Sequence, residues 1–183
     1  MRLPLKTARL VLREMNSGDW RSIAAYNAAP EFHRFLPIAP PDAETTRGFV
    51  MLCVARAREL PRRHFDAVLQ ERALGQVVGT LRLSLRGRGY GDLGYAIRPE
   101  FWNRGFATEA VRAVLDEARK SLDLGEVWAT VDPSNGASCR VMEKLGFRHC
   151  AGEAGAPIKP GRPPSWVYMR DLGRAAEVSE RTV

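Results

Sequence analysis

The stretch PEFWNRGFATEA, residues 99–110, joins a loop to the start of a helix, with Gly105 at the junction. Its first half favours a turn, and its second half begins a helical pattern. The first N–H groups of a helix have no intrahelical partners, and the helix dipole adds partial positive charge there. A glycine lets a ligand approach the backbone, and Arg104 adds a full charge. The stretch therefore predicts an anion-binding site.

The segments on either side place this loop between a strand and a helix. DLGYAI (92–97) is predicted to be a strand, and a helix is predicted over 107–122. The helix has one apolar stripe that should pack on a sheet, formed by Ala110, Val111, Val114, Leu115 and Ala118. The loop is neither a P-loop nor a dinucleotide fingerprint. Taken alone, a turn glycine before an ordinary helix is the simpler interpretation.

A second cluster, VDPSNGASCRVMEKLGF (131–147), changes this balance. Asn135 and Ser138 open a short helix directly after the predicted strand VWATV (127–131), and their spacing puts them on one face. If the two strands are neighbours, both loops open at the edge of the sheet where ligands bind. Helix capping also explains both residues.

The rest of the chain predicts further strands and helices without a linker or an internal repeat. Strands are expected at 8–14, 65–71, 76–87 and 165–171, and helices within 16–29 and 41–60. Asn16 or Ser17 should cap the first of these helices. The buried side of the second should contain Phe49, Leu52, Cys53 and Ala57. The segments 30–41 and 153–164 are predicted to be irregular, and 173–183 a polar tail.

Composition limits the class of protein and its partners. The chain has 183 residues and a net charge of +7, so one globular domain with an anionic partner is expected. The arginines are scattered and no recognition motif is present, which argues against a specific nucleic-acid partner. Cys53, Cys139 and Cys150 form no CxxC pair, so neither disulfides nor a metal site is expected. No signal peptide or membrane span is recognised, which predicts a cytoplasmic protein without a membrane partner.

The two clusters together resemble the acyl-coenzyme A (CoA) binding core of the GNAT N-acetyltransferases. The segments 94–118 and 131–147 carry the resemblance, and 5–20 and 75–83 resemble its RimJ/RimL-like branch, the ribosomal-protein N-terminal acetyltransferases. The resemblance implies an α/β (α+β) domain over 1–172. Its mixed central sheet would have six to seven strands, about four flanking helices and a split between the two central parallel strands. A homodimer is compatible with this branch.

The resemblance also implies where acetyl-CoA binds. The pyrophosphate would lie on backbone N–H groups of 102–108, and the pantetheine arm would enter the split beside the strand that ends at Ile97. Asn135 would hydrogen-bond the pantetheine and Ser138 would lie near the thioester sulfur, whereas a solvated helix face explains Arg140 equally well. The implied CoA-binding residues are Ile97, Trp102, Asn103, Arg104, Gly105, Phe106, Ala107, Thr108, Asn135, Ser138 and Arg140.

The implied reaction is attack of a neutral primary amine, on a protein N-terminus or a small molecule, on the thioester. Ser138 is the predicted acid, acting directly or through water, and Asp92 is a candidate to draw a proton through water. A charge at the strand edge also explains Asp92. Backbone N–H groups near Ile97 and Arg98 are expected to stabilise the oxyanion.

Departures from the family pattern leave alternatives open. Met142 stands where many members carry a tyrosine that acts as general acid, and Trp102 stands where Gln or Arg is common. His33 and His64 could act as bases, but boundary or surface roles explain them as well. A non-catalytic acyl-CoA binding module with the same fold is therefore the alternative to an enzyme.

Overall fold

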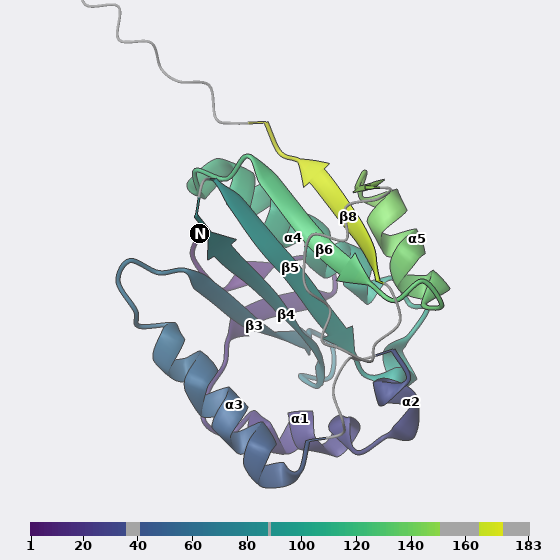
Figure 1. Ribbon diagram of the computed structural model, residues 1–183. Helices are drawn as coiled ribbons and strands as arrows, with labels where there is room; N and C mark the ends of the chain where they lie inside the picture. Colours follow the sequence, from purple (N-terminus) through teal and green to yellow (C-terminus); the bar gives the residue numbers. More distant parts are fainter. Residues whose placement is uncertain (36–40, 88, 151–164, 174–183) are drawn as a thin grey trace, which may run out of the picture.

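The computed structural model describes residues 1–35, 41–87, 89–150 and 165–173 (Figure 1). Within these residues the chain forms one eight-stranded sheet in the order β1-β2-β3-β4-β5-β6-β8-β7, with helices on both faces. The strands are β1 (Leu5–Lys6), β2 (Leu10–Glu14), β3 (His64–Glu71), β4 (Val77–Arg86), β5 (Tyr90–Ile97), β6 (Glu126–Val131), β7 (Arg148–His149) and β8 (Trp166–Asp171). The helices are α1 (Trp20–Asn27), α2 (Pro30–His33), α3 (Ala43–Arg56), α4 (Phe106–Ser121) and α5 (Gly136–Lys144), with a 3₁₀ turn at Pro99–Phe101.

The sheet is mixed, as predicted. β5 and β6 are parallel neighbours, and every other adjacent pair of strands is antiparallel. The strands expected at 65–71 and 76–87 form the antiparallel pair β3–β4. Because β5 and β6 are parallel, both strands end at the same edge of the sheet, and the loops that follow them lie there.

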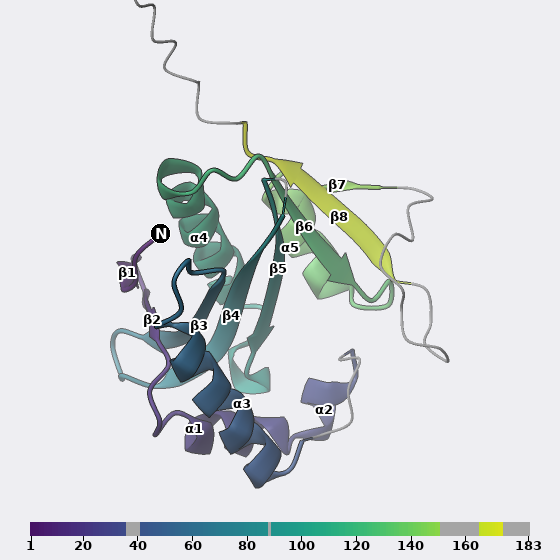
Figure 2. The ribbon, with the colours of Figure 1, turned by 60° about the vertical axis from the view of Figure 1, so that its left-hand side comes forward.

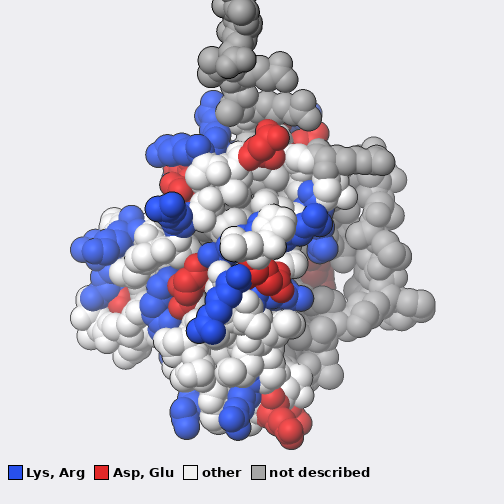
Figure 3. All heavy atoms as spheres, turned by 90° about the vertical axis from the view of Figure 1, so that its left-hand side faces the viewer, with Lys and Arg blue, Asp and Glu red and all other residues white. Residues whose placement is uncertain are grey.

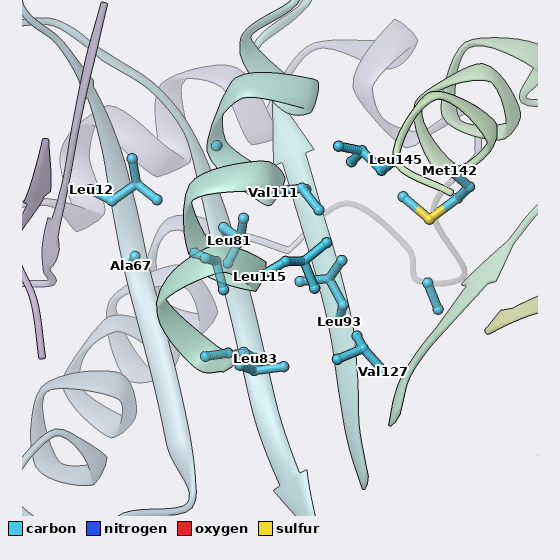
Figure 4. Packing of buried hydrophobic residues seen from close by; sticks show 14 of the residues in the cluster. Leu12, Ala67, Leu81, Leu83, Leu93, Val111, Leu115, Val127, Met142 and Leu145 are labelled. Carbon is cyan, nitrogen blue, oxygen red and sulfur yellow. The ribbon is translucent and has the colours of Figure 1, made fainter. Parts of the chain in front are cut away.

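Two hydrophobic cores lie on the two faces of the sheet. Adjacent β3 residues Val68 and Leu69 point to opposite faces and belong to different cores. α4 and α5 cover one face, and α1, α2 and α3 contribute to the core on the other (Figures 1 and 2). Figure 4 shows Val111 and Leu115 of α4 over sheet residues that include Leu81 and Leu93. The apolar stripe predicted for α4 is therefore confirmed.

The sheet has more strands, and the chain more helices, than predicted. β1 and β7 have two residues each, which is too short for an alternating pattern to be recognised. α2 occupies the start of the segment that was predicted to be irregular, with Pro30 at its first turn. The remainder of that segment at 36–40, the predicted loop 153–164 and residues 174–183 of the tail lie outside the described residues.

Two details of the N-terminal helices were predicted wrongly. The residue that precedes α1 is Asp19, not Asn16 or Ser17, and its carboxylate accepts hydrogen bonds from Arg13 and from the Asn16 N–H. An acid that is engaged by a neighbouring strand therefore marks the start of this helix.

The second wrong detail concerns the buried face of α3. Its buried residues are Thr46, Val50 and Cys53, whereas Phe49 and Leu52 are 37% and 46% exposed. The apolar residues of α3 lie on several sides of the helix, so their spacing could not identify the face that is buried. The Arg82 guanidinium of β4 lies over the Phe49 ring, 5.2 Å from its centroid.

Along the described ranges, no helix combines the length and apolar character that crossing a bilayer requires. The charged residues are also mixed in sign. On the face seen in Figure 3, Lys and Arg side chains lie among Asp and Glu side chains. The positive charge on that face is therefore not gathered into one basic area.

Replacing Leu115 by alanine should destabilise the domain, because this α4 side chain is only 1% exposed and packs against the sheet. We expect the free energy of unfolding to fall by about 2–5 kcal/mol. Urea denaturation followed by circular dichroism measures this change. The control is Arg119→Ala, an exposed position one turn later, which should change stability by less than about 0.5 kcal/mol. Equal small effects would contradict the assignment of this core.

Candidate active site

β5 and β6 separate after only three residue pairs. Their pairing runs from Tyr90↔Glu126 to Asp92↔Trp128. Beyond this point β5 stays paired with β4 as far as Ile97, and β6 stays paired with β8 as far as Val131. The two strands therefore diverge while each is held on its other side (Figure 2). An unpaired strand edge of this kind can bind an extended, amide-containing ligand as if it were an added strand.

A cleft of about 490 Å³ occupies the split. Its volume lies within the range of roughly 300–1,000 Å³ that is usual for small-molecule sites. One wall is residues 93–97 of β5 and another is 129–131 of β6, while the openings of α4 and α5 complete it. Phe32 of α2 and Phe35 line the side away from these helices. The cleft thus brings together both clusters that the sequence singled out.

The loop before α4 contains two residues with left-handed backbone conformations. Asn103 has φ 59°, and Gly105, the N-cap residue, has φ 79°. Glycine adopts this region freely, and asparagine adopts it more readily than most residues. The indole N–H of Trp102 donates to the Ile97 carbonyl at 2.6 Å and fixes the loop to the end of β5.

The first turn of α4 presents backbone donors to the cleft. Glu109 is the first residue whose N–H bonds back along the chain, to the Gly105 carbonyl at 3.0 Å. The N–H groups of residues 106–108 precede it and lack intrahelical acceptors. Residues 105–108 all line the cleft, so this helix start has the donors and the dipole that an anion requires.

The opening of α5 carries both of its predicted residues into the cleft. Asn135 caps the helix, and its Oδ1 accepts a hydrogen bond from the Ser138 N–H at 3.0 Å. The capping interpretation is thus correct for this oxygen. Asn135, Ser138 and Arg140 nevertheless line the cleft, and the cap does not use the two N–H donors of the Asn135 amide.

Tyr95 is a polar residue of the site that sequence analysis missed. Its hydroxyl donates to Ser138 Oγ at 3.2 Å, which links β5 to α5 across the split. Burial raises the pKa of Tyr95 to about 12, although the hydrogen bond to Ser138 acts in the opposite direction. The phenol is therefore protonated at neutral pH and can serve as a donor. Residues 92–97 did predict a strand, but nothing local distinguished which face would meet Ser138.

Three predicted contributors lie elsewhere or are otherwise engaged. The Asp92 carboxylate pairs with Arg86 and is not part of the cleft lining. The side chain of Arg104 is also absent from the lining, and its guanidinium lies 5.2 Å from the Phe101 ring centroid. The oxyanion donor was predicted among the backbone N–H groups near Ile97 and Arg98, and of these two the Arg98 N–H donates to the Val78 carbonyl of β4. Since successive N–H groups of a strand alternate in direction, the Ile97 N–H faces the split.

Both histidines that were considered as bases are bonded outside the cleft. His33 Nε2 lies 2.6 Å from the Asn27 carbonyl oxygen, and His64 Nδ1 lies 3.1 Å from Ser84 Oγ. Burial lowers the pKa of His64. Cys139 and Met142 are buried in the core.

Comparison with known proteins agrees with this geometry. The acetyltransferase (GNAT) domain family matches residues 9–148. The uncharacterized N-acetyltransferase p20 of Bacillus licheniformis is 29% identical over 147 residues, covering 79% of this chain and 82% of that protein. Two solved structures share the fold. Ribosomal-protein-S5-alanine acetyltransferase from Vibrio fischeri has a TM-score of 0.78 at 19% identity, covering 93% and 97% of the two chains. Mycobacterium smegmatis RimJ in complex with CoA-disulfide has a TM-score of 0.73 at 20% identity, covering 93% and 84%.

The family match extends over most of the chain, so this protein belongs to the GNAT acetyltransferase family. It is an N-acetyltransferase, an enzyme of the class that takes its acetyl group from acetyl-CoA.

Replacing Gly105 by alanine should weaken acetyl-CoA binding, because a side chain at φ 79° costs roughly 1–2 kcal/mol. The loop would relax to another conformation, and the ligand would have to restore the first. We expect the Kd from calorimetry to rise about 5- to 30-fold. Gly48→Ala is the matched control, since it lies in α3 with open space around it and should leave Kd unchanged. An unchanged Kd for Gly105→Ala would remove this residue from the site.

Proposed function

We propose that the protein transfers the acetyl group of acetyl-CoA to a primary amine by direct attack, as a member of the RimJ/RimL-like branch. The acceptor is the α-amine of a protein N-terminus or a small-molecule amine. The observation that carries the proposal is the Tyr95–Ser138 hydrogen bond across a cleft that opens beside the N-termini of α4 and α5.

The residues of the cleft fit acetyl-CoA. The unpaired N–H groups at the start of α4 suit its pyrophosphate, and Gly105 leaves them open to the ligand. The free edge of β5 suits the amides of the pantetheine arm, which Asn135 would also contact through its amide nitrogen. Arg140 adds positive charge along the same cleft.

The thioester supplies the acetyl group. Residues of the chain stabilise the carbonyl oxygen, protonate the sulfur and restore the proton of the donor. The acceptor nitrogen bonds to the carbonyl carbon, the carbon–sulfur bond breaks, the nitrogen loses one proton and the sulfur gains one. The Ile97 N–H, which faces the split, is the proposed donor to the oxygen of the attacked carbonyl. Ser138 donates the proton that sulfur gains, and Tyr95 restores it through their hydrogen bond. Water, which takes the proton that the nitrogen loses, returns one to Tyr95.

This arrangement takes over the role of the tyrosine that Met142 replaces. Met142 is fully buried and has no proton to give, whereas the Tyr95 phenol reaches the same region from β5. The Tyr95 hydroxyl donates to the Ser138 hydroxyl, and Ser138 is the proposed donor that contacts the sulfur. The aromatic rings of Phe32 and Phe35 form the opposite wall, where the acceptor would enter.

An α-amine suits a site in which the predicted carboxylate, Asp92, does not line the cleft. At pH 7 roughly one α-amine in ten is already neutral, against about one lysine side chain in a few thousand. The name of the Vibrio fischeri enzyme, a ribosomal-protein-S5-alanine acetyltransferase, supports the same kind of acceptor. With Asp92 paired to Arg86, the acceptor would lose its proton to water.

A panel of amines tests the acceptor class by release of free thiol from acetyl-CoA. N-terminal peptides, and small primary amines whose pKa lies near that of an α-amine, should react, with a rate that rises with pH up to about 8 as the amine loses its proton. An N-terminally blocked peptide with an internal lysine is the control and should react far more slowly. Tight acetyl-CoA binding without thiol release from any acceptor would favour the non-catalytic module instead.

Tyr95→Phe tests the proton relay, because it removes the hydroxyl and preserves the ring. We expect kcat to fall about 10²-fold, at the lower end of what general acids contribute, with acetyl-CoA Kd changed by less than about twofold. Ser138→Ala should lower kcat by at least as much. Tyr90→Phe, an exposed tyrosine at the start of the same strand, should behave as wild type. A normal kcat for Tyr95→Phe would leave Ser138 acting without this partner.

A further inference from the structure

The turn between β1 and β2 is fastened to the first turn of α4, about 100 residues away in the sequence. The Thr7 hydroxyl donates to Glu109 Oε1 at 2.6 Å, and the Arg9 backbone N–H donates to the same oxygen at 2.8 Å. Arg9 Nε and Nη2 both lie 2.7 Å from Glu109 Oε2. Both oxygens of the Glu109 carboxylate are therefore engaged by one short segment.

The same arginine also holds the loop that precedes α4. Arg9 Nη1 donates to the carbonyl oxygen of Arg104 at 2.8 Å. Its guanidinium carbon lies 4.6 Å from the centroid of the Phe106 ring, and its Nη2 would lie 3.4 Å from a Cβ placed on Gly105. Arg9 thus contacts Arg104 and Phe106, the residues on either side of Gly105 at the junction of loop and helix.

This loop needs support from outside its own sequence. Asn103 and Gly105 both have positive φ. A residue other than glycine adopts positive φ infrequently, so the conformation of Asn103 is poorly populated in an isolated chain. Residues 103–105 are exposed, so little packing restrains them. The hydrogen bond from Arg9 to the Arg104 carbonyl fixes the peptide group that joins Arg104 to Gly105, between the two residues with positive φ.

This contact differs from an exposed surface ion pair in the burial and hydrogen bonding of Glu109. The Glu109 side chain is only 17% exposed, and Arg9 is 47% exposed. Burial acts to raise the pKa of Glu109, but the hydrogen bonds from Thr7 and Arg9 and the Arg9 charge outweigh it, so the pKa lies below its ordinary value. The carboxylate is thus charged at neutral pH and holds the Arg9 guanidinium at the loop.

We propose that Thr7, Arg9 and Glu109 form a clamp that holds the loop 102–105 in the shape that binds the pyrophosphate of acetyl-CoA. The inference rests on the proposed function, because it assigns that loop to the pyrophosphate. Arg9 and Glu109 are positioning residues, since they act through the backbone N–H groups of the loop. When the clamp is absent, the loop occupies its binding shape for only a fraction of the time, and the apparent affinity falls by that fraction.

The test compares two acetyl donors, one with and one without the pyrophosphate that the loop would bind. Acetyl-CoA contains the pyrophosphate, and S-acetylpantetheine lacks it. In Glu109→Gln and Arg9→Gln, calorimetry should give a Kd for acetyl-CoA about tenfold or more above wild type. An NMR titration should give a Kd for S-acetylpantetheine within about twofold of wild type. The matched controls Glu117→Gln and Arg119→Gln, further along α4, should change neither value.

Each other result overturns a stated part. Wild-type protein that does not bind acetyl-CoA would remove the proposed function and the clamp with it. Normal wild-type binding with an unchanged Kd in both clamp variants would remove the clamp alone. Equal weakening for both donors, with a lower melting temperature, would show that Thr7, Arg9 and Glu109 serve stability rather than the loop.

Discussion

The backbone hydrogen bonds between β5 and β6 end at Asp92↔Trp128, and the rest of the site depends on this. Both strands continue for several residues, but each then has a partner on one side only. The pairings with β4 and β8 keep them extended, so the strands diverge without losing their shape. Divergence leaves one row of peptide groups on β5 free for a ligand and opens the cleft between the two strands. A sheet that was paired to the end would have no room there.

The helices convert this opening into a site because their positions are fixed by packing. α4 buries one stripe on the sheet, which directs its N-terminus toward the edge where β5 ends. α5 is held on the same side by Met142, which directs Asn135 and Ser138 toward the cleft. Near the N-terminus of the chain, Arg9 in the β1–β2 turn contacts the start of α4. The site therefore combines residues from the β1–β2 turn, from β5 to the start of α4, and from β6 to α5.

The long elements were predictable because each carries a repeated pattern. The α4 stripe and the strands β3 and β4 were predicted close to their final bounds. The parallel pairing of β5 with β6 was expected only from the family resemblance. The two-residue strands and α2 were missed, since so few residues hold no period. In α3 the pattern misled, because Phe49 and Leu52 are apolar yet exposed, while Thr46 is buried. Which side of that helix turns inward depends on the sheet beneath it, and its own sequence does not contain that information.

By itself, the sequence determined the features that arise from local backbone chemistry. A glycine at a helix start allows a positive φ, an asparagine before the next helix caps it, and the strand–loop–helix order leaves donors at one edge of the sheet. Only the tertiary structure decided which side chains meet across that edge. Tyr95 and Ser138 are 43 residues apart, Arg9 and Glu109 are 100 residues apart, and Asp92 turns to Arg86 instead of the cleft. These contacts depend on strand register and on the packing of helices against the sheet, because those two factors set the direction in which each side chain points.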